Sequence, residues 1–127
     1  MSDALRETCV TELVAALRAL ASEPSDQLAL FPDSISRAGD LASRYDDCVR
    51  AVYDECGGDL SRAQVEALTA LSARLATISR DGAEFDPGLW TEEAVRASVH
   101  WRDVRALATA AIDAFEDATA DMRGAGA

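Results

Sequence analysis

Cysteine and histidine are the most reactive side chains in this sequence, and they are few. The chain has three cysteines, Cys9, Cys48 and Cys56, and one histidine, His100. A cysteine activated by a histidine is a nucleophile, and four such side chains together hold zinc. No C-x-x-C pair occurs, and each cysteine lies in an apolar helical pattern without a nearby base or glycine turn. We therefore expect the cysteines to be small buried hydrophobic residues.

Other catalytic patterns are also missing from the sequence. Cys48 and Cys56 are eight residues apart, about 12 Å along a helix, which is too far for a disulfide. A di-iron helical site needs Glu-x-x-His pairs, but Ala97 stands three residues before His100 and there is no second histidine. All 12 basic residues are arginine, so Schiff-base chemistry and a P-loop lysine are excluded. We expect a non-enzyme without metal or cofactor.

Carboxylates are the remaining side chains that can act on a partner. Acidic residues number 23, and the net charge is −11. They form two clusters, one of Asp46, Asp47, Asp54, Glu55 and Asp59 and one of Asp113, Glu116, Asp117 and Asp121. Such runs are typical of a solvated helix face, and the alternative is a docking surface for the arginines and lysines of another protein. In the first cluster, Asp46, Asp47, Asp54 and Glu55 are the candidate contacts, with Tyr53 as an anchor.

The acidic charge also restricts the class of partner. It repels nucleic-acid backbones and anionic membrane surfaces, so neither is expected to bind directly. The longest stretches without a charge, Ala67–Ala73 and Ala106–Ile112, have seven residues each, against about 20 for a membrane span. The N-terminus carries Asp3 and Glu7 where a secretory signal carries basic residues. These features predict a cytoplasmic protein.

Helices must position these residues. Alanine and leucine, which favour helix, number 26 and 13, whereas the aromatic residues, which favour strands, number only 7. Apolar spacing predicts a first helix over Asp3–Ala21. Pro24 begins a short helix capped by Ser22, and the expected core plug is Leu28, Leu30 and Phe31. A second long helix is predicted from Asp33 or Ser34 to a left-handed cap at Gly57-Gly58.

The later helices have clear start signals. Ser61 and Gln64 form a capping box for a third long helix, flanked by a Leu60–Val65 hydrophobic staple, and Arg80-Asp81-Gly82 ends it. Thr91 caps a following helix that Ser98 interrupts, and the last long helix runs from Val99 to Gly124.

The predicted fold class is all-α, a compact antiparallel bundle of four long helices with one or two short ones. Residues 1–127 form one domain with a frayed tail over 122–127, either as a monomer or as a small homo-oligomer. The predicted core consists of Leu13, Leu17, Leu41, Val52, Leu68, Leu71, Leu75, Leu107 and Ile112.

Two short segments resemble parts of known proteins. Pro24–Asp33 (PSDQLALFPD) and Leu89–Val95 (LWTEEAV) are similar to segments of small acidic helical proteins of bacteria. Some such proteins resemble immunity proteins, which bind and neutralise a toxin. The resemblance implies a helical inhibitor with a protein partner, and it carries over no site residue.

Three functions follow as expectations. The first is an acidic protein-binding module, most concretely an immunity- or antitoxin-like inhibitor that occludes a basic surface of a partner such as a toxin. The second is a nucleic-acid mimic whose carboxylates imitate phosphates at a DNA-binding protein. The third is a small-ligand binder or enzyme with a pocket near His100 and Trp101. The plainer expectation for His100 is a half-buried side chain that closes a helix junction.

Overall fold

The computed structural model describes residues 3–30, 37–79 and 82–125, and this part of the chain is helical with no strand. The all-α prediction is confirmed. The elements in chain order are α1 (Asp3–Ala21), α2 (Pro24–Ala29), α3 (Arg37–Cys56), η1 (Gly57–Asp59), α4 (Arg62–Ile78), η2 (Pro87–Trp90), α5 (Glu92–Ala97) and α6 (Val99–Ala125), where η marks a 3₁₀ turn. No helix within the described residues is long and apolar enough to cross a membrane.

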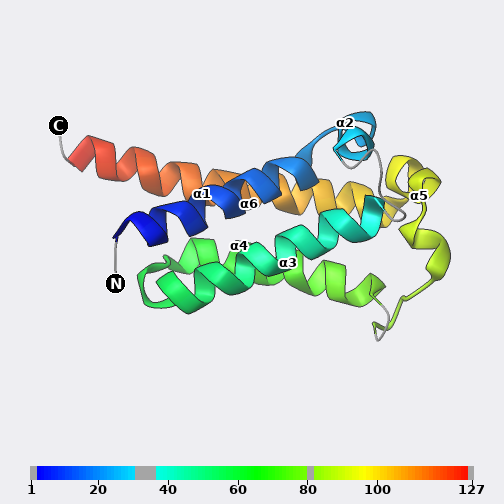
Figure 1. The fold of residues 1–127 in the computed structure, drawn as a ribbon, viewed down its shortest axis with the longest axis horizontal. Helices are drawn as coiled ribbons and strands as arrows, with labels where there is room; N and C mark the ends of the chain where they lie inside the picture. Colours follow the sequence, from blue (N-terminus) through cyan, green and yellow to red (C-terminus); the bar gives the residue numbers. More distant parts are fainter. Residues whose placement is uncertain (1–2, 31–36, 80–81, 126–127) are drawn as a thin grey trace.

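The four long helices lie side by side along the longest axis of the molecule (Figure 1). The chain runs in one direction along α1 and α4 and in the opposite direction along α3 and α6. Helix α1 packs closely against both α3 and α6, and α4 packs closely against α6. Helices α3 and α4 approach each other over a much shorter stretch. The short elements α2, η2 and α5 gather at the end where α3 and α6 begin.

The core lies where these helices meet. Of the nine predicted core residues, seven are buried: Leu13, Leu17, Leu41, Val52, Leu68, Leu71 and Leu75. Leu107 and Ile112 are only partly buried and pack against the rim of the core. The largest fully buried side chain is Trp101, followed by Tyr45. These two aromatic side chains are therefore the bulkiest members of a core that is otherwise mostly aliphatic.

Two predicted helix starts are confirmed. The Ser61 hydroxyl accepts a hydrogen bond from the Gln64 backbone N–H at 3.1 Å, and the Gln64 side chain accepts from the Ser61 N–H at 2.9 Å. This is the reciprocal capping box at the start of α4. The Thr91 hydroxyl likewise accepts from the Ala94 N–H at 3.1 Å and caps α5. Ser98 ends α5, as predicted, and its hydroxyl accepts from the His100 N–H.

Other predicted boundaries are wrong. Glu23, not Ser22, is the N-cap of α2, because the Ser22 hydroxyl instead donates to the Arg18 carbonyl at 2.7 Å in the last turn of α1. Leu30 is 47% exposed and does not plug the core, although Leu28 does. After α3 the chain tightens into the 3₁₀ turn η1, so Gly57 and Gly58 form no left-handed cap.

The remaining predicted boundaries are shifted or untested. The predicted start of the second long helix at Asp33 or Ser34 falls outside the described residues, as does Phe31. Helix α4 ends at Ile78, and α6 extends to Ala125, one residue beyond the predicted end. Fraying of the tail over 122–127 stays a prediction, and residues 126–127 lie outside the described part.

Candidate functional site

The five predicted contact residues lie on α3 but do not share one face. At 100° per residue, Asp47 and Asp54 are about 20° apart, and both are exposed on the outer side of the helix. Asp46 and Tyr53 are also about 20° apart, but they lie on the flank that is turned toward α4. Both are exposed, Tyr53 by 39%. The helical geometry therefore divides the predicted cluster into two exposed pairs.

Glu55 does not share a face with either pair, and its contact with a partner stays a prediction. It is half-buried on the flank turned toward α1, and within the described structure its Oε2 atom is buried without a hydrogen-bond partner. Glu55 acts on Cys9 of α1: burial raises the pKa of the Cys9 thiol, and electrostatic interactions with Cys56 and Glu55 raise it further. Glu55 is directed at the α1–α3 contact because it is eight residues, about 80°, around the helix from Asp47.

Most of the negative charge on the outer side of α3 is not neutralised by ion pairs. Arg50 Nη2 lies 2.8 Å from Asp46 Oδ2, and both side chains are mostly exposed. Among the described residues, Asp47 and Asp54 have no ion pair. In the η1 turn, Asp59 Oδ2 pairs with Arg6 Nη1 of α1 at 2.8 Å. Asp59 therefore helps to join α1 to the end of α3, whereas Asp47 and Asp54 keep their negative charge free for an external cation.

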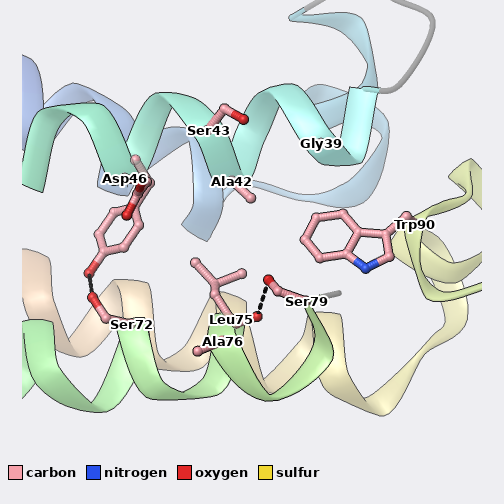
Figure 2. Close-up of a pocket in the computed structure, with 10 residues that line it drawn as sticks. Gly39, Ala42, Ser43, Asp46, Ser72, Leu75, Ala76, Ser79 and Trp90 are labelled. Carbon is pink, nitrogen blue, oxygen red and sulfur yellow. Dashed lines mark hydrogen bonds between the residues drawn. The ribbon is translucent and has the colours of Figure 1, made fainter. Parts of the chain in front are cut away.

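A cleft of about 400 Å³ lies between α3 and α4 (Figure 2). From α3 it is lined by Gly39, Ala42, Ser43, Tyr45 and Asp46. Four of these five are small or uncharged, and Asp46 brings a carboxylate to one end of the cleft. The volume is within the range of about 300–1,000 Å³ that is typical of small-molecule sites.

The opposite wall of the cleft comes from α4 and η2. Helix α4 contributes Ser72, Leu75, Ala76 and Ser79, and η2 contributes Trp90. In Figure 2 the Trp90 ring projects between the two helices at the end opposite Asp46 and Ser72. The cleft therefore has an aromatic end and an acidic end, with small side chains between them.

Hydrogen bonds orient the polar atoms of the cleft. Tyr45 donates its single hydroxyl hydrogen to the Leu68 carbonyl at 3.2 Å, so the Ser72 hydroxyl at 2.9 Å must be the donor to Tyr45. Burial raises the pKa of Tyr45 to about 12. The hydrogen bond with Ser72 lowers this pKa, but by less than burial raises it. Ser79 donates its hydroxyl hydrogen to the Leu75 carbonyl at 2.6 Å. These three hydroxyl groups therefore offer the cleft lone pairs and no free hydrogen.

Trp90 is held rigidly at its end of the cleft. Its Nε1 donates to the Ile78 carbonyl at 2.9 Å, and its ring stands edge to face against Trp101, with centroids 5.6 Å apart and planes at 87°. Trp101 is fully buried and donates to the Leu89 carbonyl at 2.6 Å. Trp101 is a core residue behind Trp90, and neither it nor His100 lines this cleft, so the ligand pocket expected near these two residues stays a prediction.

His100 is half-buried at the α5–α6 junction, where the plainer expectation placed it. In the described part of the chain its Nδ1 atom is buried without a partner. The three cysteines are free thiols, with Cys9 and Cys56 buried and Cys48 half-buried. No group of three or more His, Cys, Asp or Glu side chains among residues 3–30, 37–79 and 82–125 is arranged to hold a metal ion.

Sequence reasoning found Asp46 but not the cleft it lines. Ser72 and Tyr45 are 27 residues apart and have no local pattern that relates them. Comparison with known proteins adds nothing to this geometry, since no protein-family model, curated protein or solved structure matches the chain.

Proposed function

We propose that this chain is a non-enzymatic, cytoplasmic protein-binding module that docks a basic partner on the outer side of α3. The observation that carries the proposal is the exposed, unpaired carboxylate pair Asp47 and Asp54, two helical turns apart, with exposed Tyr53 on the adjacent flank of the helix. The most concrete form of this function is an immunity- or antitoxin-like inhibitor that covers a basic active site of a toxin. Free thiols at all three cysteines are consistent with a reducing compartment.

Electrostatics support a basic partner. The net charge of −11 attracts a positively charged protein over a long range and speeds its association. Tyr53 adds an amphipathic ring of the kind that dominates binding energy in protein interfaces. On this surface Arg50 is already paired with Asp46, so it offsets little of the charge of Asp47 and Asp54.

The proposed scaffold for this surface is an antiparallel bundle of four long helices. What supports it is the opposite chain direction of neighbouring helices in Figure 1 and the close packing of α1 on α3 and α6 and of α4 on α6. In such a bundle α3 is already folded and packed on α1, so little conformational entropy is lost when a partner binds its exposed side.

The test compares three baits in affinity capture from the native organism. These are the unchanged protein, the double reversal Asp47→Arg with Asp54→Arg, and a control with Glu84→Arg and Asp113→Arg. The control makes the same change in net charge at two exposed positions away from α3. We expect a basic protein that the unchanged and control baits retain and the double reversal loses, while circular dichroism shows the same helix content in all three.

Once that protein is purified, its affinity should fall as salt rises, because exposed charges are screened within about 10 Å at 0.1 M. An excess of the unchanged protein should also inhibit the activity of the purified partner. If the double reversal retains the basic protein as well as the unchanged bait does, the outer side of α3 is not the docking surface. A partner lost equally from the control and the double reversal would show a response to net charge alone and contradict a defined docking surface.

A further inference from the structure

We infer that the cleft between α3 and α4 is a binding site for a small organic amine with an aromatic or aliphatic body. The ammonium group lies at the Asp46 end, and the apolar body extends toward Trp90 (Figure 2). This site is separate from the docking surface proposed above, which uses the outer side of α3. Either proposal can therefore fail without the other.

The polar atoms of the cleft select a hydrogen-bond donor. The hydroxyl hydrogens of Tyr45, Ser72 and Ser79 are all committed to protein acceptors, and Asp46 is an acceptor when ionised. The Ser43 hydroxyl on the α3 wall is the remaining donor, so a carboxylate or phosphate ligand would meet mostly acceptors. An ammonium group has three donors and no acceptor, so it complements this lining.

Asp46 supplies the charge that the ammonium needs. It is the ionisable acid among the cleft residues, and its present partner is Arg50, 2.8 Å away. The Arg50 side chain is 73% exposed and that of Asp46 is 55% exposed. A pair so exposed contributes little net free energy, so Arg50 can move into solvent at small cost when an ammonium replaces it.

The opposite end of the cleft suits an apolar body. Leu75, Ala42 and Ala76 line the cleft between its ends, and Trp90 closes it. The Trp90 ring is already fixed by its hydrogen bond to Ile78 and its contact with Trp101, so binding does not need to order it. Gly39 and Asp46 are seven residues apart, about 10 Å along α3, which gives the length of a ring joined to an amine by a short chain.

The whole-chain charge reinforces the same choice. A surface with a net charge of −11 concentrates small cations near the protein and depletes anions. The ligand class that matches the lining, the cleft length and the charge is a protonated arylalkylamine.

Binding is tested with 2-phenylethylamine at constant ionic strength, and the readout is the indole N–H signal of Trp90 in a ¹H–¹⁵N spectrum. Trp90→Phe assigns that signal, and the buried Trp101 indole is the internal reference. We expect saturable binding with a dissociation constant on the order of 1 mM. The neutral isostere 2-phenylethanol should bind about tenfold more weakly, and 3-phenylpropionate should not bind.

Three variants locate the site. Asp46→Asn removes the charge but keeps the size, and it should weaken amine binding about three- to tenfold. Ala76→Leu fills the cleft from an exposed helix position with another good helix former, and it should abolish binding while circular dichroism is unchanged. Asp113→Asn makes the same charge change on the exposed surface of α6 and should bind the amine like the unchanged protein.

Several results would overturn the assignment. They are no saturation up to about 10 mM, equal affinity for the amine and the alcohol, or an Asp46→Asn protein that binds like Asp113→Asn. A folded Ala76→Leu protein that still binds the amine would place the site elsewhere. Tighter binding of Nα-acetyl-lysine methylamide than of 2-phenylethylamine would also overturn it, since the amine would then belong to a partner's lysine side chain.

Discussion

The Nη1 atom of Arg105 donates a hydrogen bond to Oε1 of Gln27, 78 residues away in the sequence, at 3.3 Å. The same nitrogen donates to the Val95 carbonyl at 2.9 Å, and Gln27 Nε2 donates to the Leu20 carbonyl at 2.8 Å. Gln27 is fully buried, and burial lowers the pKa of Arg105. These two side chains therefore connect α1, α2, α5 and α6 at one end of the molecule.

Gln27→Leu is expected to destabilise the fold by about 2–3 kcal/mol, because it leaves the Leu20 carbonyl without its side-chain donor and removes one acceptor from Arg105. Urea unfolding followed by circular dichroism measures the change. Adding Arg105→Met removes the stranded donor, so the double variant should lose less than the sum of the two single variants. Strict additivity would contradict a coupled network.

Leu71→Ala should lower the free energy of unfolding by about 2–5 kcal/mol, because Leu71 is fully buried in α4. The matched control is Leu30→Ala. Leu30 is 47% exposed, so the same truncation there should change stability by no more than about 0.5 kcal/mol. Chemical denaturation of both variants measures this difference, and similar losses at the two positions would show that the core is assigned wrongly.

The capping box gives a third prediction. Ser61→Ala should cost about 1 kcal/mol, since the Gln64 N–H loses its acceptor at the start of α4. Ser22→Ala is the control: Ser22 precedes Pro24 like a cap, but its hydroxyl bonds back to Arg18, so the loss there should be a few tenths of a kcal/mol. The two thermal midpoints, measured side by side, check the assignment, and a larger loss at Ser22 would reverse it.

The raised pKa of Tyr45 predicts how the free energy of unfolding changes at alkaline pH. Its pKa in the folded state is about 12, against 10 for an ordinary tyrosine, so the folded state holds the proton more tightly. The stabilisation is complete below pH 10 and is lost as the pH rises from 10 to 12, by about 2 kcal/mol in all.

Urea unfolding at pH 9 and pH 11.5 measures this loss. Cysteines titrate in the same range, so the comparison is with Tyr45→Phe, which retains the ring and lacks the ionising hydroxyl. That variant should lose less stability between the two pH values than the unchanged protein. An equal loss in both proteins would assign the effect to other groups.

Local chemistry along the chain determined the helical class and several helix starts in advance. The Ser61–Gln64 box and the Thr91 cap span three residues each, so their hydrogen bonds form wherever the local backbone becomes helical. Apolar spacing identified buried leucines such as Leu13 and Leu68 for the same reason, because one face of an amphipathic helix must leave water.

Tertiary structure alone decided which neighbour each flank of α3 meets. Asp46 and Glu55 are nine residues apart and chemically similar, yet Asp46 lines the cleft beside α4 and Glu55 is directed at α1. The sequence marks both as acidic helix positions, but the roles of these positions depend on how far apart α3 and α4 lie. That distance is set by contacts between residues remote in the chain, such as those of Tyr45 with Leu68 and Ser72.

The same reason explains the Gln27–Arg105 pair and the error at Leu30. Gln27 and Leu30 are three residues apart on the short α2 segment, and the local pattern favours burying the leucine. Packing buries Gln27 instead, because the Leu20 carbonyl of α1 and the Arg105 guanidinium of α6 converge there and satisfy its amide. Local sequence specifies the partners a side chain can accept, whereas the meeting of distant helices determines which of those partners it finds.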